Sequence, residues 1–120
     1  MTYEELLNSI QYPNFHDSGL VSLKIEFLDE KSLEFTQRVV ISIATSFKDD
    51  PEDINKIDLV FSHVCNLNIT ASMNDERFYE SSGIDRLSYD GKAFVITTQK
   101  GWEMSFQSDE VNIINSLAGH

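Results

Sequence analysis

Apolar and polar side chains alternate along most of this chain, and that alternation constrains its fold more than any other feature. The pattern begins with Val21, Leu23, Ile25 and Phe27, separated by Ser22, Lys24, Glu26 and Leu28. It is repeated by Leu33, Phe35, Val39, Ile41, Ile43 and Phe47, and then by Ile57, Leu59, Phe61, Cys65, Leu67 and Ile69. A period of two sends successive side chains to opposite faces of a strand. It therefore predicts an antiparallel sheet covered on one face, with a turn at Asp29-Glu30-Lys31 and one long bent strand or two strands after it.

Two further strands are predicted between turn signals near the end of the chain. Asp90-Gly91 and Lys100-Gly101 flank the runs KAFVITT and WEMSFQ, and Asp-Gly between β-prone runs is a strong hairpin signal. The first run is apolar on both faces, which is typical of a central strand. The second run places Trp102, Met104 and Phe106 on one face, which is typical of a strand with one solvated side.

One short helix is expected at the start. Thr2 and Glu5 have the spacing of a capping box, and the apolar residues that follow share one helical face before Pro13 ends the helix. Those residues are Tyr3, Leu6, Leu7 and Ile10. At the other end, Val111 and Ile113 can extend the sheet, or Ser108 can cap a terminal helix; we favour the strand. Residues 72–84 lose the alternation and are expected to form an irregular connection, with Met73, Phe78, Tyr79 and Ile84 as anchors.

The expected fold is therefore one α+β domain over residues 1–120. It consists of an N-terminal helix packed on a mainly antiparallel, twisted meander sheet of about six or seven strands. A chain of 120 residues can bury one compact core.

Charge limits the partners that such a domain can bind. Nine basic against twenty acidic residues give 9 − 20 = −11, a field that repels nucleic acid and anionic lipid and attracts a basic protein. The start MTYEELLNSI has no secretory pattern and no stretch has the length of a membrane span, so a cytoplasmic protein is expected. With Cys65 as its only cysteine, the chain can form neither an internal disulfide nor a multi-cysteine zinc site. No cofactor motif is present.

Clustered acids form the first candidate site. Asp49, Asp50, Glu52 and Asp53 lie around Pro51 in KDDPEDINK, which is expected to be a loop. Their spacing does not match a calcium-binding loop, so a solvated acidic surface for a basic partner is the favoured interpretation.

His16 and Asp17 form the second candidate site, directly before the first strand. As metal ligands or an acid/base pair they would need further groups nearby. As a structural pair, Asp17 would accept from backbone amides at Ser18-Gly19 while His16 packs or hydrogen-bonds across the sheet. The structural interpretation is the favoured one.

His63 is the third candidate, because strict alternation puts it on the apolar face between Phe61 and Cys65. A buried neutral imidazole is the first explanation, and a bulge near Ser62 that turns the ring outward is the second. Pairing of His63 with Cys65 as base and nucleophile is a less favoured third alternative, because buried cysteines are usually inert.

Several segments together resemble a set of small bacterial α+β proteins. These segments are His16-Asp17-Ser18 with Leu20-Val21-Ser22-Leu23-Lys24-Ile25, then Leu59-Val60-Phe61-Ser62-His63-Val64, and finally Gly101-Trp102-Glu103-Met104-Ser105-Phe106. Some members of this set are similar to predicted immunity proteins of bacterial polymorphic toxin systems. The resemblance implies a non-enzymatic binding protein and supplies no catalytic residues. The alternative is a small-molecule or metal-binding protein, or a weak hydrolase, that uses His16, Asp17 and His63.

Overall fold

Eight strands, one short α-helix and one 3₁₀ turn make up the described part of the computed structural model, which covers residues 2–28, 31, 33, 36–70, 83–99, 101 and 103–115. Helix α1 is Tyr3–Ser9 and the 3₁₀ turn η1 is Pro13–Phe15. The strands are β1 Gly19–Glu26, β2 Arg38–Phe47, β3 Asp50–Ser62, β4 Cys65–Thr70, β5 Ile84–Tyr89, β6 Phe94–Thr98, β7 Glu103–Gln107 and β8 Glu110–Asn115.

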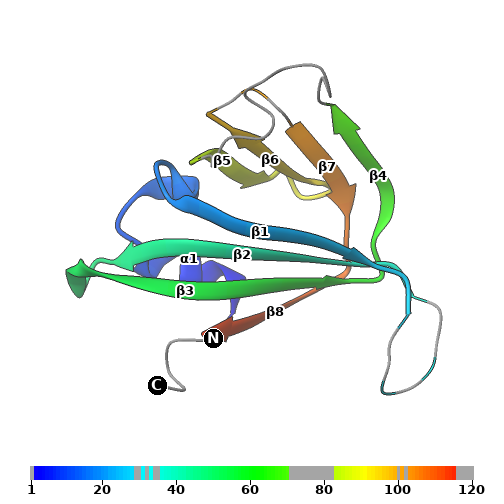
Figure 1. The fold of residues 1–120 in the computed structure, drawn as a ribbon, viewed down its shortest axis with the longest axis horizontal. Coiled ribbons are helices and arrows are strands. Elements are labelled where there is room, and N and C mark those ends of the chain that lie inside the picture. Colours follow the sequence, from blue (N-terminus) through cyan, green and yellow to red (C-terminus); the bar gives the residue numbers. More distant parts are fainter. Residues whose placement is uncertain are drawn as a thin grey trace.

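The described strands form two antiparallel sheets rather than the expected single sheet of six or seven strands. The first sheet has the order β1-β2-β3-β8 and the second has the order β4-β7-β6-β5 (Figure 1). The expected α+β character and antiparallel pairing are confirmed. The number of strands and the single layer were wrong, because the pattern of alternation does not reveal where a strand leaves one sheet and enters another.

A two-stranded ribbon belongs to both sheets and joins them. In the first sheet β3 pairs with β8, and after a bend β4 pairs with β7 in the second sheet. We call this bend the ribbon corner, residues 62–65 and 107–110. Strands that switch sheets at a bend are the usual device by which two sheets pack across one another. In Figure 1 the second sheet accordingly rises from the right-hand end of the first.

The two sheets are joined a second time by main-chain hydrogen bonds between β1 and β5. The amide of Asp17 donates to the carbonyl of Ile84 at 3.0 Å, and the amide of Ile84 donates to the carbonyl of Ser18 at 2.7 Å. Gly19 and Gly83 form a β-bridge beside them. We call this join the β1–β5 seam, residues 17–19 and 83–85.

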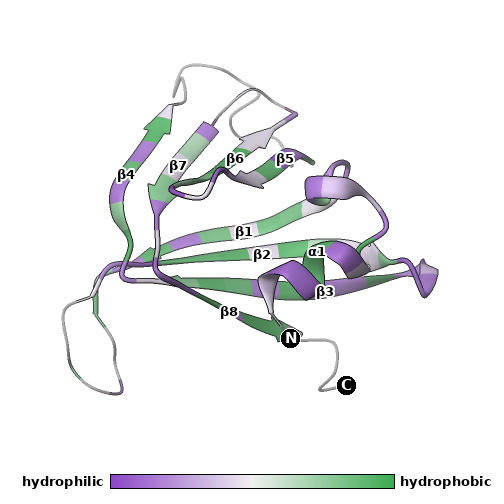
Figure 2. Cartoon of the chain, turned by 180° about the vertical axis from the view of Figure 1, so that it is seen from behind, coloured by the Kyte–Doolittle hydropathy of each residue, from purple (hydrophilic) through white to green (hydrophobic). Residues whose placement is uncertain are grey.

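One hydrophobic core fills the space between the sheets and α1. Helix α1 lies behind the first sheet in Figure 1 and in front of it in Figure 2, which views the molecule from the opposite side. Three phenylalanines from three strands meet in this core: the ring of Phe61 lies 4.8 Å from that of Phe94 and 4.9 Å from that of Phe106, both edge to face. The buried apolar residues are Leu6, Ile10, Phe15, Val39, Ile41, Ile43, Ile57, Leu59, Phe61, Val64, Ile84, Leu87, Phe94, Ile96, Met104 and Phe106. The predicted inward faces of β2, β6 and β7, and of β3 from Ile57 onward, are confirmed by this set.

The first strand departs from the predicted alternation. Its register against β2 shifts between Leu20 and Ser22, so Val21 is the extra residue of a β-bulge and is 52% exposed. One extra residue in a strand changes which side chains face inward. Leu20 therefore packs against the core in place of Val21, and the predicted inward positions resume at Leu23 and Ile25. Phe27 is exposed because it lies beyond the end of β1 at Glu26.

A second departure occurs at the ribbon corner, where the expected alternation through His63 and Cys65 fails. His63 has a left-handed φ of 53°, and the chain leaves the first sheet there. After the bend Val64 is buried, while Cys65 and Ile69 are exposed. Of the predicted inward residues in this segment, only Leu67 packs on the core.

Helix α1 begins and ends as expected, and the Asp90-Gly91 turn and the C-terminal strands are also confirmed. The amide of Glu5 donates to the Thr2 hydroxyl at 3.1 Å, and the helix ends before Pro13. Asp90-Gly91 forms the β5–β6 turn with φ of 91° at Gly91, and β6 lies between β5 and β7. Residues 110–115 form strand β8 rather than a helix. Asp29, Glu30, Phe35, Met73, Phe78, Tyr79, Lys100, Trp102 and residues 116–120 lie outside the described residues.

In the part of the chain that the structure describes, no helix has the length and apolar character needed to cross a membrane.

Replacing Phe61 with alanine should lower the free energy of unfolding by about 3–5 kcal/mol, because its ring fills the space between the sheets. Phe61→Leu should cost clearly less, since it keeps most of the volume. Urea denaturation measures both changes. An equal loss for the two variants would contradict a role that depends on filling this space.

Replacing Tyr3 with phenylalanine should stabilise the protein. The Tyr3 hydroxyl is buried without a hydrogen-bond partner among the described residues, and burial raises the pKa of this phenol. Removing an unsatisfied buried hydroxyl should raise the free energy of unfolding by about 1 kcal/mol. Tyr89→Phe is the matched control, since Tyr89 also contacts Phe94 but is exposed, and it should change little. A clear loss of stability in Tyr3→Phe would show that the hydroxyl has a partner.

Candidate functional site

The His16-Asp17 pair lies in a tight loop between η1 and β1. Asn14, Phe15 and Asp17 all have left-handed backbone angles, with φ of 55°, 60° and 64°. Asparagine and aspartate tolerate this region well, whereas phenylalanine does not. Phe15 is held there because its ring is buried in the core. The buried ring thus anchors the loop, and His16 and Asp17 project from it into solvent.

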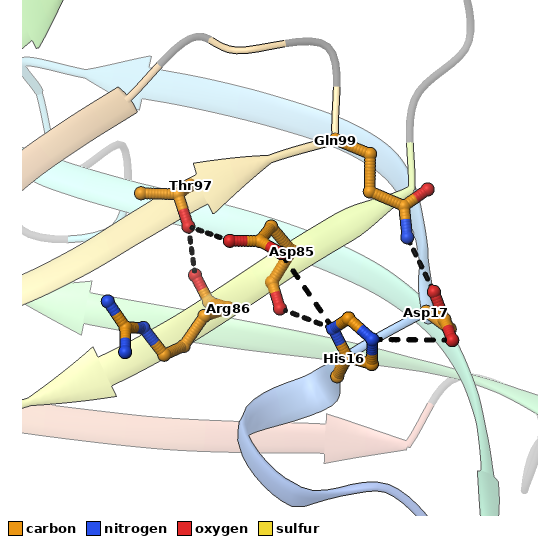
Figure 3. Close-up of polar contacts among 6 residues, drawn as sticks. All are labelled: His16, Asp17, Asp85, Arg86, Thr97 and Gln99. Atoms are coloured by element: carbon orange, nitrogen blue, oxygen red, sulfur yellow. Dashed lines mark hydrogen bonds and ion pairs between the residues drawn. The ribbon is translucent and has the colours of Figure 1, made fainter.

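His16 reaches across from this loop to β5 (Figure 3). Its Nδ1 lies 2.9 Å from the backbone carbonyl oxygen of Asp85. A carbonyl oxygen only accepts, so Nδ1 carries a proton and donates it. The other ring nitrogen, Nε2, lies 3.5 Å from a carboxylate oxygen of Asp17, and the Asp85 carboxylate is 3.9 Å from Nδ1. The imidazole is therefore set between two carboxylates and one carbonyl.

This arrangement favours the charged imidazolium. The hydrogen bond to the Asp85 carbonyl, together with the negative charge of Asp17, raises the pKa of His16 above its ordinary value. Since Nδ1 already holds a proton, Nε2 of the neutral ring presents a lone pair to the Asp17 carboxylate. Protonation of Nε2 replaces that repulsion with an attraction. The pair is screened by solvent, because both side chains are more than half exposed.

Two residues from the second sheet complete the cluster. The side-chain amide of Gln99 donates to Asp17, and the Thr97 hydroxyl donates to the Asp85 carboxylate at 3.2 Å (Figure 3). The expected amide donors to Asp17 at Ser18-Gly19 are thus replaced by Gln99. The sequence pattern did not predict Asp85, Thr97 or Gln99 as partners of the pair. Nothing local could have identified them, because they lie more than 65 positions away in the chain, as the 69-residue separation of His16 and Asp85 illustrates.

The hydroxyl nearest to the pair in this cluster is not directed to the imidazole. Among the described residues, the Thr97 hydroxyl donates to the Asp85 carboxylate and to the Arg86 carbonyl. Within the described ranges no group of three His, Cys, Asp or Glu side chains is arranged to hold a metal ion. The contacts that exist fasten the η1–β1 loop to β5.

His63 is not brought to this cluster. It lies at the ribbon corner, where its Nδ1 is 2.9 Å from a carboxylate oxygen of Asp109. Gly19, just after the His16-Asp17 pair, is in register with Ala44 of β2 and, through it, with Lys56 of β3. His63 lies seven residues beyond Lys56 along the chain, so it is separated from the pair by roughly 20 Å at about 3.3 Å per residue. The side chain is 59% exposed, so the expectation of a buried imidazole was wrong and the outward-turned alternative is confirmed.

Cys65 lies two residues beyond His63, also in an exposed position. Its thiol is 3.6 Å from the side-chain oxygen of Gln107, which also accepts from Asn66 at 3.1 Å. Its described contacts therefore belong to the β4–β7 pairing rather than to a cysteine–histidine pair.

The acidic residues Asp49, Asp50, Glu52 and Asp53 lie at the tip of the β2–β3 hairpin, all exposed. The expected loop is shorter than predicted, because β3 begins at Asp50 and continues through Pro51. The ladder shifts register between Thr45 and Phe47, where Asn55 and Asp50 are the facing residues. Proline is tolerated at such a position, since the ladder hydrogen bond it would remove is already missing there.

Two of these carboxylates interact directly. A side-chain hydrogen bond to Asp53 raises the pKa of Asp50, because a carboxylate beside another carboxylate holds its proton more firmly. The tip therefore concentrates negative charge at one point.

Comparison with known proteins gives no matching family model, no curated protein and no solved structure with significant similarity.

The pKa of His16 can be checked by NMR titration. We expect the imidazole to titrate above about 6.5, the ordinary value for histidine. Asp17→Asn should lower the pKa, because it removes the negative charge facing Nε2. Asp109→Asn is the matched control at the other histidine and should leave the His16 titration unchanged. A His16 pKa that is unaffected by Asp17→Asn would contradict the assigned contact.

Proposed function

We propose that this chain is a non-enzymatic binding module for a basic protein, and specifically that it acts as an immunity protein that neutralises a basic toxin. The observation that carries this proposal is the cluster of exposed carboxylates at the tip of the β2–β3 hairpin. The net charge of −11 supports it. So does the resemblance of the His16-Asp17-Ser18 segment and the later strand motifs to predicted immunity proteins.

The position of the acidic tip suits a role in association. The hairpin is the longest pair of strands in the described structure, and its tip lies at the far left of Figure 1, away from the second sheet. Charges that protrude from a protein meet an approaching partner first. Complementary charge mainly speeds association and selects the partner.

The Asp50–Asp53 contact provides a second argument. Two adjacent carboxylates repel each other unless a proton or a cation lies between them. A lysine or arginine of a partner would supply that cation and lower the pKa of Asp50. Binding should therefore release protons at mildly acidic pH, a linkage that calorimetry in buffers of different ionisation enthalpy can detect.

The alternative of a small-molecule binder, metal-binding protein or weak hydrolase depends on convergence of His16, Asp17 and His63. The strand register separates His63 from the other two by about half the length of β3. No observation therefore favours that alternative over protein binding.

The experiment begins with the gene next to this one in its genome. If that gene encodes a secreted toxin with a basic domain, both proteins are purified and their association rate is measured over a range of salt concentrations. We expect rapid association that slows as salt rises. A neighbouring toxin that does not bind at any salt concentration would count against the proposal.

Two variants of equal net charge test whether the tip, rather than the total charge, drives association. The tip variant combines Asp49→Asn, Asp50→Asn, Glu52→Gln and Asp53→Asn. The control combines Glu4→Gln, Glu5→Gln, Glu103→Gln and Glu110→Gln, which are exposed positions elsewhere. Each changes the net charge from −11 to −11 + 4 = −7. The tip variant should associate about tenfold more slowly or worse, and the control should be close to wild type. If association slowed equally in both variants, the net charge of the whole protein, and not the hairpin tip, would drive association.

A further inference from the structure

The two sheets are held together at two exposed joins, and each join carries one of the two described histidines. His16 lies directly before the β1–β5 seam and contacts Asp85 across it. His63 lies in the ribbon corner and contacts Asp109 across it. The His16 ring comes from the η1–β1 loop and Asp85 from β5, while His63 and Asp109 come from the two turns of the ribbon corner.

At the β1–β5 seam, the described main-chain contacts form a short ladder. Among the residues that the structure describes, the amides of Asp17 and Ile84 donate to the carbonyls of Ile84 and Ser18, with the Gly19–Gly83 bridge beside them. The buried Ser18 hydroxyl donates to Thr45 at 2.8 Å inside the seam. On the solvent side, His16 links Asp17 to Asp85, and Gln99 donates to Asp17. The protonation of the His16 imidazole can therefore affect the few main-chain hydrogen bonds of the seam beside it.

At the ribbon corner the chain bends on both strands. His63 and Asn66 have left-handed backbone conformations, with φ of 53° and 54°. Such conformations are unfavourable for residues other than glycine, so contacts of the surrounding structure must maintain them. The Ser108 hydroxyl donates to the carbonyl of Ser62 at 2.6 Å, and the His63–Asp109 contact spans the same two turns. The imidazole thus adds a tie across the bend.

We propose that His16 is a proton-controlled fastening that tightens the β1–β5 seam when its imidazole is charged and relaxes it as the proton is lost. This inference concerns the fold and does not depend on the proposed partner.

Carboxylates lie at both ring nitrogens of His16, which gives protonation its effect. His16 faces Asp17 from its own loop and Asp85 from β5; from the β6 side it faces the uncharged Thr97 and Gln99. Arg86 is the charged neighbour on β5, and Figure 3 shows its guanidinium directed away from the imidazole. A proton added to His16 therefore places a cation between two carboxylates in a chain of net charge −11.

The sign of the effect follows for His16. Its pKa is raised in the folded protein, so its contribution is fully present below the ordinary histidine value and is lost as the pH rises through the folded value. The β1–β5 seam should be tightest at mildly acidic pH and loosen above neutrality.

Native-state hydrogen exchange can test this at single amides. The amides of Asp17 and Ile84 donate across the seam, and those of β6 serve as an internal reference. After correction for the intrinsic pH dependence of exchange, protection of the two seam amides should fall about two- to fivefold between pH 5.5 and 8, the size expected for an exposed ion pair. The β6 amides should not change. High salt should reduce the effect, because the charges are exposed.

Matched variants assign the effect to the His16 ring. His16→Gln keeps a donor toward the Asp85 carbonyl but cannot be charged, so the pH dependence at Asp17 and Ile84 should disappear. His63→Gln, at the ribbon corner, is the matched control and should leave the seam unchanged, as should His120→Gln, at a position outside the described residues. Wild-type protection of the Asp17 and Ile84 amides that does not vary with pH, or variation that survives His16→Gln, would overturn the proposal.

Discussion

The contact of Phe61 with Phe94 and Phe106 is the interaction on which the rest of this structure depends. It brings side chains from β3 of the first sheet against β6 and β7 of the second. Each sheet alone would expose an apolar face to water, and burying these faces against each other is the main source of stability in such a layered domain. The bend of the shared ribbon makes this possible, because it directs the second sheet over the inner face of the first. Helix α1 then covers what the second sheet leaves open, with Leu6 and Ile10 buried.

Much of this architecture was predictable from sequence because burial on one face leaves a regular trace. The inward positions of β2, β6 and β7, the last part of β3, the Asp90-Gly91 turn and the capped helix all follow from local rules of spacing and backbone preference. Two features could not be predicted from the sequence pattern. The bulge at Val21 and the left-handed bend at His63 each shift by one position the residues that face inward. The alternation of apolar and polar residues looks the same on either side of such a shift, so it does not reveal where the shift occurs. The prediction of one continuous sheet failed at the bend.

The candidate site divides in the same way. The exposure of residues 49–53 was predictable, because four acids around a proline have no favourable place in a core. The partners of His16 were not, since Asp85, Thr97 and Gln99 meet it only after the second sheet has folded back onto β1. A histidine beside an aspartate in sequence indicated a polar cluster. Its chemical character came from the long-range neighbours, which make it a fastening of the loop to β5.

The bulges in the outer strands have a consequence for how the molecule behaves in a crowded solution. β1 and β4 each end a sheet, and an unpaired strand edge can template the addition of another chain. Both strands are irregular along the edge where another strand could pair. β1 carries the extra residue Val21 and then the exposed Lys24, and β4 has a register shift between Cys65 and Asn68. Bulges and lysines twist or charge an edge so that a straight strand no longer fits along it. The bulge in β1 and the register shift in β4 thus make these two edges poor templates for an added strand.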